Sequence, residues 1–384
     1  MKWKTYRLGN ILQFNPAERL AKGTFAKKVP MDLLQPRTRA ISGFEMVSYT
    51  GGNKFRNGDT LMARITPCLE NGKTAYVSIL DEDEVGFGST EYIVFRNIEG
   101  VTDSKYIYYF VTNPWFRNIA IKSMVGSSGR QRVQLAVLEN LVVNLPPLAE
   151  QKRIADILGA LDDKIELNRR INDNLEEQAK ALFNHYFIQN TENLGEWQDG
   201  VLTDIAQYLN GLAMQKYPAM PNEAGLPVLK IKELGQGQCD TNSDRCSSLI
   251  KPEYIISDGT IIFSWSGTLL VDIWCGGKCG LNQHLFKVSS AKYPQWFVFY
   301  WTKHHLNKFI RIAKDKAVTM GHIKRCDLEI SKVKIPSKQA LVNLDKLFSP
   351  IFNRMVTCRI ENRKLSSLRD TLLPKLMSGE ISVE

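Results

Sequence analysis

Two short basic turns carry the side chains in this sequence that are best suited to reading another molecule. In Ser127–Arg132, small residues that let the backbone approach a surface are followed by three side chains with forked hydrogen-bonding groups. Arginine and glutamine forks match the edges of guanine and adenine. Thr319–Arg325 likewise combines a glycine with basic side chains. The predicted DNA contacts in these two turns are Ser128, Arg130, Gln131, Arg132, His322, Lys324 and Arg325.

A second group of candidate contacts follows a turn that leads into a short apolar strand in each half of the chain. Asn57–Arg64 resembles Ser257–Ser264, and both segments have the pattern of a turn followed by a strand. Lysines in such positions hold phosphates more often than they specify bases. The predicted contacts in this group are Arg64, Asn71, Lys73, Ser264 and Trp265.

The charge of the chain favours a polyanionic partner. The formal net charge is +10, and Lys303–Lys334 is especially rich in lysine and arginine. Neutralising DNA phosphates releases condensed counterions and gives affinity without sequence reading, so this stretch is expected to follow the phosphate backbone. The seven cysteines are odd in number and irregularly spaced, and no segment approaches the ~18 apolar residues of a membrane span. These features predict a cytoplasmic protein.

No pattern in the sequence predicts catalysis or a metal site. Gly126–Arg130 lacks the lysine and the spacing of a phosphate-binding loop, and no amino-methyltransferase motif is present. Cys275 and Cys279, even with His284, do not make a complete zinc-ligand pattern. The paired histidines at 304 and 305 are assigned no role.

Two long segments have the periodicity of paired helices, with seam residues in alternating steps of four and three. They follow Pro146 and Pro336, and adding 190 to each seam position of the first gives the second. The first seam is Ile154, Leu158, Leu161, Ile165, Asn168, Asn172, Leu175, Ala179 and Leu182; the second is Leu344, Phe348, Ile351, Met355, Cys358, Asn362, Leu365, Arg369 and Leu372.

This register predicts an internal duplication and a pairing of the two helices. Gly86–Phe95 also parallels Gly280–Val288, which extends the repeat to the segments before the helices. A carboxamide on an apolar seam costs stability unless it finds a partner, and it can then fix register. We therefore expect Asn172 and Asn362 to lie near each other. The halves are expected to be joined by a polar linker at 189–200.

The segment Leu145–Ile154, with the sequence LPPLAEQKRI, is similar to the proline-led entry into the first conserved helix of Type I restriction-modification specificity subunits. The second copy, Ile335–Gln339, lacks the second proline and the Ala-Glu-Gln run. The segment Leu372–Ile381 also looks like the C-terminus of that family. The resemblance covers essentially the whole chain.

The resemblance implies an α+β fold with two tandem target-recognition domains, each reading one half of a bipartite DNA site. Two long helices, paired as an antiparallel coiled coil, would set the spacer and give an approximate twofold symmetry. The expected boundaries are 1–145 for the first domain, 146–188 for the central helix, 189–335 for the second domain and 336–384 for the C-terminal helix and tail.

The resemblance also implies that the chain is not an enzyme and binds no cofactor itself. Its expected partners are double-stranded DNA, two methyltransferase subunits that carry S-adenosylmethionine, and restriction subunits that use ATP and Mg²⁺. Two alternatives remain at this point. One is a coiled-coil adapter whose basic domains bind protein or RNA, and the other is a self-contained DNA-modifying enzyme.

Overall fold

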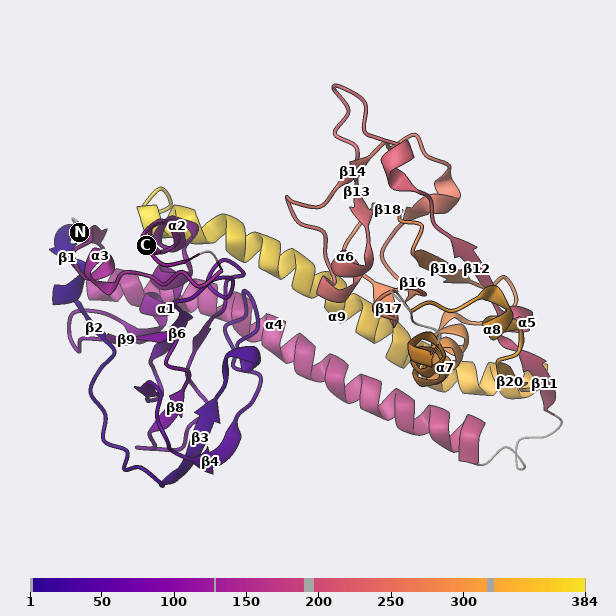
Figure 1. Cartoon of the computed structure of the whole chain (residues 1–384), viewed down its shortest axis with the longest axis horizontal. Coiled ribbons are helices and arrows are strands. Elements are labelled where there is room, and N and C mark those ends of the chain that lie inside the picture. Colours follow the sequence, from indigo (N-terminus) through magenta and orange to yellow (C-terminus); the bar gives the residue numbers. More distant parts are fainter. Residues whose placement is uncertain (1–2, 128, 190–196, 316–320, 384) are drawn as a thin grey trace. The chain divides into compact units, whose positions relative to one another are not determined.

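The computed structural model describes residues 3–127, 129–189, 197–315 and 321–383 (Figure 1). The chain divides into two compact units, Met1–Glu166 with Leu365–Glu384 and Leu167–Lys364. Each unit contains strands, short helices and one end of both long helices, so the predicted α+β class is confirmed. The predicted linker at 189–200 falls largely on residues 190–196, which lie outside the described residues.

The described strands of the first unit form three small sheets. One pairs β1 (Lys4–Arg7) with β10 (Val142–Leu145); the second has the order β2 (Leu12–Phe14), β9 (Tyr92–Asn97), β6 (Thr60–Ala63) and β7 (Thr74–Tyr76); the third has the order β4 (Glu45–Ser48), β3 (Phe25–Val29), β8 (Gly86–Gly88) and β5 (Lys54–Phe55). Neighbouring strands are antiparallel except for β3 and β8, which are parallel.

The second unit repeats this topology strand for strand. Its two-stranded sheet pairs β11 (Gln198–Val201) with β20 (Lys332–Ile335). One four-stranded sheet has the order β12 (Gln207–Asn210), β19 (Leu285–Ser289), β16 (Thr260–Ser264) and β17 (Leu270–Trp274). The other has the order β14 (Arg245–Cys246), β13 (Leu226–Leu229), β18 (Cys279–Leu281) and β15 (Ile255–Ile256). Its one parallel pair, β13 with β18, is also in the place that corresponds to β3 with β8. Equal strand order and equal strand direction support the internal duplication inferred from the helix seams.

The first unit contains the helices α1 (Ser104–Thr112), α2 (Pro114–Lys122) and α3 (Leu135–Glu139), and the second contains α5 (Leu202–Ile205), α6 (Ile231–Gln236), α7 (Gln295–Asp315) and α8 (Arg325–Glu329). Helix α1 packs against β6, β7 and β9, and α7 packs against β17 and β19 of the corresponding sheet. Helix α1 begins where the Asp103 side chain accepts a hydrogen bond from Tyr106 N at 2.9 Å, and Asn113 caps α2 in the same way. The aromatic helices predicted in both halves are therefore α1 with α2, and α7.

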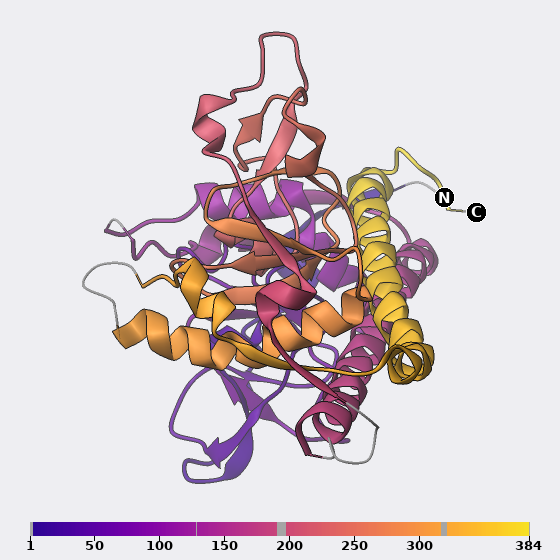
Figure 2. The ribbon, with the colours of Figure 1, turned by 90° about the vertical axis from the view of Figure 1, so that its right-hand side faces the viewer.

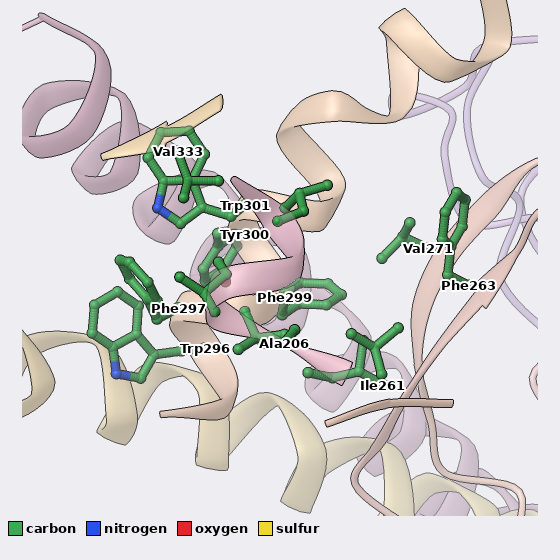
Figure 3. Close-up of a cluster of buried hydrophobic side chains, with 14 of the residues drawn as sticks. Ala206, Ile261, Phe263, Val271, Trp296, Phe297, Phe299, Tyr300, Trp301 and Val333 are labelled. Atoms are coloured by element: carbon green, nitrogen blue, oxygen red, sulfur yellow. The ribbon is translucent and has the colours of Figure 1, made fainter. Parts of the chain in front are cut away.

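The core of the second unit forms where the aromatic residues of α7 meet the strands. Helix α7 packs against β17 and β19 (Figure 2). Figure 3 shows side chains of α7, including Trp296 and Phe299, together with Ile261 and Phe263 of β16. All four are almost fully buried. Burial of large aromatic side chains is the main contribution that fixes α7 against this sheet.

The two long helices are α4 (Leu148–Phe183), which is followed by a π-helical turn (Asn184–Gln189), and α9 (Lys338–Ser378). In the first unit Ile154 and Leu158 share a core with Leu373 and Leu376, near the end of α9. In the second unit the end of α4 shares a core with the beginning of α9. Phe183 of α4 belongs to the same cluster of buried residues as Leu344 and Phe348 of α9. Residue numbers therefore rise along one helix as they fall along the other. The predicted antiparallel pairing is confirmed.

Polar residues interrupt the seam in the second unit, but their partners differ from the expected ones. Asn168 is fully buried, and its Nδ2 donates to Glu361 Oε2 and Asn362 Oδ1, both at 2.9 Å. Asn172 lies one helical turn further along α4, and its buried Oδ1 accepts no hydrogen bond. In this antiparallel register Asn168 is therefore the seam asparagine that donates a hydrogen bond to Asn362, and the expected proximity of Asn172 to Asn362 stays a prediction.

The LPPLAEQKRI motif at the start of α4 connects this helix to the rest of the first unit through hydrogen bonds. Gln151 is 2% exposed, and its Nε2 donates to the carbonyl oxygens of Pro146 and Val101 at 2.9 and 3.2 Å. Its Oε1 accepts from the N–H of Asp103, the N-cap residue of α1, at 3.0 Å. A buried carboxamide with all these bonds orients α4 relative to α1. The second copy has Leu341 at the corresponding position.

A buried histidine predicts how the stability of the second unit depends on pH. His305 is 9% exposed, and its Nε2–H donates to the carbonyl oxygen of Lys332 at 2.9 Å. Burial lowers the pKa of His305 to about 4, although the bond to Lys332 acts in the opposite direction. The histidine therefore binds a proton at a higher pH in the unfolded chain than in the folded chain. The stability that neutral His305 contributes is complete above about pH 6.5 and is lost as the pH falls toward 4.

We expect this histidine alone to remove about 1 kcal/mol of stability between pH 7 and pH 5.5. His305→Gln, which does not titrate there, should lose correspondingly less over the same interval in urea titrations. Equal pH dependence of the variant and the wild-type chain would contradict this expectation.

Candidate nucleic-acid interface

The basic turn of the first unit is a tight hairpin that leads into α3. Val125 and Arg132 exchange two backbone hydrogen bonds at 2.9 and 3.0 Å, and Arg130 N donates to Ser127 O at 3.0 Å. Gly126 has a φ of 142°, and a Cβ there would lie 2.8 Å from Arg130 O. The close approach of the two arms therefore requires glycine. Ser128, one of the predicted DNA contacts, lies outside the described residues.

This hairpin is fixed against the end of β6. Thr66 N donates to Gln131 O at 3.1 Å, and Val133 N donates to Arg64 O at 2.9 Å. Arg64 N in turn donates to Glu91 O at 2.9 Å, which adds the residue before β9 to the same junction. The structure therefore brings together the predicted residues at positions 64 and 130–132, which are far apart in the sequence.

The arginines of this junction differ in how their guanidinium groups are engaged. Arg132 donates to both carboxylate oxygens of Glu91, at 2.6 to 3.0 Å, and this pairing raises the pKa of Arg132. Arg130 is exposed, and its side chain forms no hydrogen bond or ion pair within the described part of the chain. Arg130 can therefore meet a ligand without breaking an internal contact. Arg132 instead acts together with Glu91.

The remaining predicted residues of the first unit have mixed surroundings. Arg64 is half-buried, and its Nη2 donates to Val133 O at 3.3 Å. Asn71 is exposed in the turn before β7. Lys73 donates to the carbonyl oxygen of Met31 at 2.8 Å, so its ammonium group stabilises a neighbouring loop in this conformation.

The corresponding junction of the second unit is built from the same backbone contacts with different side chains. Ile323 N donates to Trp265 O at 3.1 Å, Gly267 N donates to Gly321 O at 3.0 Å, and residues 266 and 322 form a β-bridge. The Trp265 Nε1 donates to Asn210 Oδ1 at 2.9 Å. Its ring lies beside those of His284 and His322, with centroids 6.0 and 6.4 Å away. An aromatic and imidazole surface thus takes the place of the arginine and glutamate of the first unit.

The strand register corrects the sequence alignment of the two junctions by one residue. Ala63 pairs with Tyr92 in the first unit, and Ser264 pairs with Leu285 in the second. Arg64 therefore corresponds to Trp265 rather than to Ser264. A shift of one residue turns every side chain of a strand to the other face.

Ser264 accordingly does not lie on the predicted contact surface. It is fully buried, and its hydroxyl donates to the carbonyl oxygens of Thr268 and Ser266 at 2.8 and 3.3 Å. These bonds shape the turn after β16. The structure therefore assigns Ser264 a role in holding Trp265 in place rather than in direct contact.

The basic residues of α7 and of the segment after it are only partly available to a ligand. Lys324 and Arg325 are exposed at the beginning of α8, where Arg325 forms a long 3.9 Å contact with Glu329. Lys334 is paired with Asp199 at 2.7 Å, and Lys303 is paired with Glu176. Residues 316–320, which include part of the predicted second turn, lie outside the described residues.

Sequence reasoning missed the segment that precedes β9 and β19. Glu91 and His284 hold equivalent positions, and His284 Nδ1 lies 3.0 Å from Ser266 Oγ. In the second unit Asn282, Gln283 and His284 also line a cavity of about 590 Å³ that extends to Lys230 and Arg245. The polar run Asn282–His284 before an apolar strand was visible in the sequence. Its position beside Trp265 depends on strand pairing, which the sequence did not reveal.

The described residues contain no group of three or more His, Cys, Asp or Glu side chains arranged as a metal site. The seven cysteines are free, and burial raises the pKa of Cys275 to about 11. No described helix combines the length and the apolar character that crossing a bilayer requires.

Comparisons with known proteins place these two junctions in a family context. Residues 1–177 match the family model of the Type I restriction modification DNA specificity domain. The Type I restriction enzyme MjaIX specificity subunit of Methanocaldococcus jannaschii is 27% identical over 76% of this chain and 72% of its own length. The HindI specificity subunit of Haemophilus influenzae is 22% identical, with 99% of both chains covered. Residues 1–177 thus match a Type I restriction modification DNA specificity domain, and the chain as a whole is similar to specificity subunits of Type I restriction enzymes.

A solved structure of a specificity subunit has the same fold as this chain. The S subunit of the Type I restriction-modification system from M. genitalium aligns with a TM-score of 0.55 and 16% sequence identity, covering 97% of this chain and 96% of its own. The specificity-subunit fold expected from the LPPLAEQKRI motif is thereby confirmed for a chain whose sequence has diverged widely from that relative.

Proposed function

We propose that this chain is a specificity subunit that recognises a bipartite DNA sequence, with one half-site read by each unit. The observation that carries the proposal is the repeated junction on topologically identical units. At each junction the end of β6 or β16 meets the residue before β9 or β19 and the segment before a short helix, residues 131–133 or 321–323. Similarity to DNA specificity subunits supports DNA as the ligand. The differing side chains at equivalent positions are what two different half-sites would require.

Each junction supplies donors and flat surfaces of a kind that suits base edges. In the first unit Arg130 offers a guanidinium fork and Gln131 a carboxamide on a hairpin narrow enough to approach a groove. In the second unit Trp265, His284 and His322 offer an aromatic surface with ring nitrogens. Because backbone hydrogen bonds already fix these junction segments, they lose little conformational entropy when they bind a ligand.

The subunit acts without chemistry of its own in this proposal. Methylation would require methyltransferase subunits with bound S-adenosylmethionine, and cleavage would require restriction subunits with ATP and Mg²⁺, all docked on this chain in the cytoplasm. The antiparallel α4 and α9 helices offer the partners a related surface at each end, because the start of one helix always lies beside the end of the other. This geometry suits two identical methyltransferase subunits.

Selection of duplexes from a random library by the full chain with its methyltransferase tests the function. We expect enrichment of one split motif in the presence of excess competitor DNA. Equal binding of all duplexes, or preferential binding of RNA or protein, would favour the coiled-coil adapter. Methylation or cleavage by the isolated chain would instead identify a self-contained enzyme.

Lys324 allows the electrostatic part of the proposal to be tested separately. Its side chain is exposed and has no partner within the described residues. Lys324→Gln should weaken binding to all sequences alike and reduce the slope of log K against log salt by about one unit, since one phosphate contact is lost. Lys334→Gln is the matched control, because Lys334 is already paired with Asp199. Equal slopes for wild-type and Lys324→Gln chains would exclude a phosphate contact at this lysine.

A further inference from the structure

A cavity of the first unit is lined by two arginines, Arg37 and Arg117, whose side chains have no hydrogen-bond acceptor in the part of the chain that the structure describes. It has a volume of about 180 Å³ and lies among the turn before β7, helices α1 and α2, and the ends of α4 and α9 that belong to this unit. The basic and acidic residues that line it are Arg37, Arg117, Arg369, Asp162 and Asp370. What the cavity can bind depends on which of these charged side chains already form internal ion pairs.

Both carboxylates of the cavity are engaged by the same arginine. Arg369 donates to Asp162 Oδ1 at 2.6 Å, and through Nε and Nη2 to Asp370 Oδ1 at 3.0 and 2.8 Å. Asp162 also accepts from the Tyr109 hydroxyl at 2.7 Å. Arg369 therefore has two acidic partners, and these contacts leave no internal ion pair for the other two arginines.

Arg37 and Arg117 lie together on either side of Gly72. A methyl group added at Gly72 would lie 3.1 Å from Arg117 Nη1 and 3.2 Å from Arg37 Cγ. The Nε of Arg117 is buried and donates no hydrogen bond, and the Arg37 side chain forms none either within the described part of the chain. Burial lowers the pKa of Arg117, and the charge of Arg37 lowers it further against the opposite effect of Asp370.

Two further features indicate that this arrangement serves a ligand. Arg37 has a φ of 55°, a left-handed conformation that is unfavourable for a residue other than glycine and is often found at binding sites. Its backbone is fixed there by a 3.0 Å hydrogen bond from Arg37 N to Gly72 O. Arg37 is exposed and Arg117 is half-buried, but the Nε of Arg117 is buried without an acceptor beside the charge of Arg37. Such a group is costly unless an anion completes the site.

We propose that this cavity binds a phosphate group between Arg37 and Arg117. Planar guanidinium groups bind the oxygens of phosphate through paired hydrogen bonds, and two of them would compensate its charge. The phosphate can come from the DNA backbone or from free phosphate. The first source rests on the proposed function, whereas the second does not.

Thermal unfolding of the full chain in sodium phosphate, compared with sodium chloride at equal ionic strength, tests the site without DNA. Near saturation, phosphate should raise the Tm of the wild-type chain by roughly 3 °C. Arg37→Gln and Arg117→Met should lose this shift. Arg19→Gln, an exposed arginine of the same unit, should keep it.

The sign of the effect without phosphate separates a binding site from a structural arginine. Because Arg117 has no internal acceptor, Arg117→Met should have a Tm equal to or above that of the wild-type chain in chloride, and below it in phosphate. If Arg117→Met fails to fold, the ³¹P linewidth of phosphate in the presence of the wild-type chain, and of Arg37→Gln, provides the same test. Equal phosphate shifts in the wild-type chain and both variants, or no shift and no line broadening with the wild-type chain, would overturn the proposal.

Duplex binding then identifies the source of the phosphate. If Arg117→Met lowers the salt slope of DNA binding by about one unit, a backbone phosphate occupies the cavity. If the slope is unchanged while the phosphate-dependent Tm shift is lost, the ligand is free phosphate. If DNA is not bound at all but the Tm shift persists, the proposed function fails and the phosphate site stands.

Discussion

Replacing Arg369 with leucine is expected to lower the free energy of unfolding by about 3–5 kcal/mol. The side chains of Arg369 and Asp162 are 10% and 4% exposed, and they form a 2.6 Å ion pair between the two long helices within the first unit. Burial opposes the charge of Arg369, but the Asp162 and Asp370 carboxylates outweigh it and raise the pKa of Arg369. Without the guanidinium, Asp162 would be a buried carboxylate with Tyr109 as its hydrogen-bond donor.

Urea unfolding of the full chain measures this effect. Lys375→Gln is the matched control on the same helix, because its ion pair with Glu380 has side chains that are 43% and 62% exposed and should contribute less than about 1 kcal/mol. The double variant Asp162→Leu/Arg369→Leu should recover much of the loss, since it removes both charges. An Arg369→Leu chain as stable as the Lys375→Gln chain would show that the pair does not hold the helices together.

Replacing Arg130 with alanine is expected to weaken binding to the preferred duplex by about 1–3 kcal/mol, roughly 5- to 150-fold, and to relax preference at one position. The change should leave folding intact, because the Arg130 side chain forms no internal contact in the described part of the chain. The affected position should lie in one half-site, with the other half-site read as before. Competition binding with duplexes that carry single base changes measures both effects.

Arg19→Gln serves as the control for the loss of one positive charge in the same unit, and it should not change preference at any position. If Arg130→Ala altered neither affinity nor preference, the assignment of the 126–132 hairpin to base reading would be wrong.

Periodicity in the sequence was sufficient to predict the two long helices, their pairing and the duplication. The seam of α4 repeats from Ile154 to Leu182 within a helix of 36 residues, and such long regularities are the least ambiguous signal in a sequence. The partner of Asn362 could not be predicted in the same way. If α4 shifts by one helical turn along α9, Asn172 takes the place of Asn168 opposite Asn362, and the apolar residues still face each other. Only the packing of the side chains distinguishes the two registers.

The one-residue error at the junctions has an identifiable cause. The alignment of Asn57–Arg64 with Ser257–Ser264 matched two threonines and so placed Gly58 opposite Asp258. Gly58 and Gly259 are the residues that adopt left-handed conformations, with φ of 92° and 84°. Matching these turn glycines would have aligned Arg64 with Trp265, because the turn conformation fixes where each strand begins.

The contacts that define the candidate interface were beyond reach of the sequence. The pairing of Arg132 with Glu91 joins residues 41 positions apart, and it depends on the hairpin docking beside the end of β6. The Arg37 and Arg117 cavity likewise depends on how α2 packs on the turn at Gly72. Composition identifies the charged residues, but tertiary packing decides which of them are free to bind.

Mapping methylated bases across a genome, in cells that express this chain with its cognate methyltransferase, would show whether the chain selects a bipartite site. We expect one motif made of two specific parts separated by a fixed number of unspecified bases, with Arg130→Ala altering one part alone. Methylation at a single continuous motif, or the same methylation in cells that lack this chain, would contradict selection of a bipartite site by this chain.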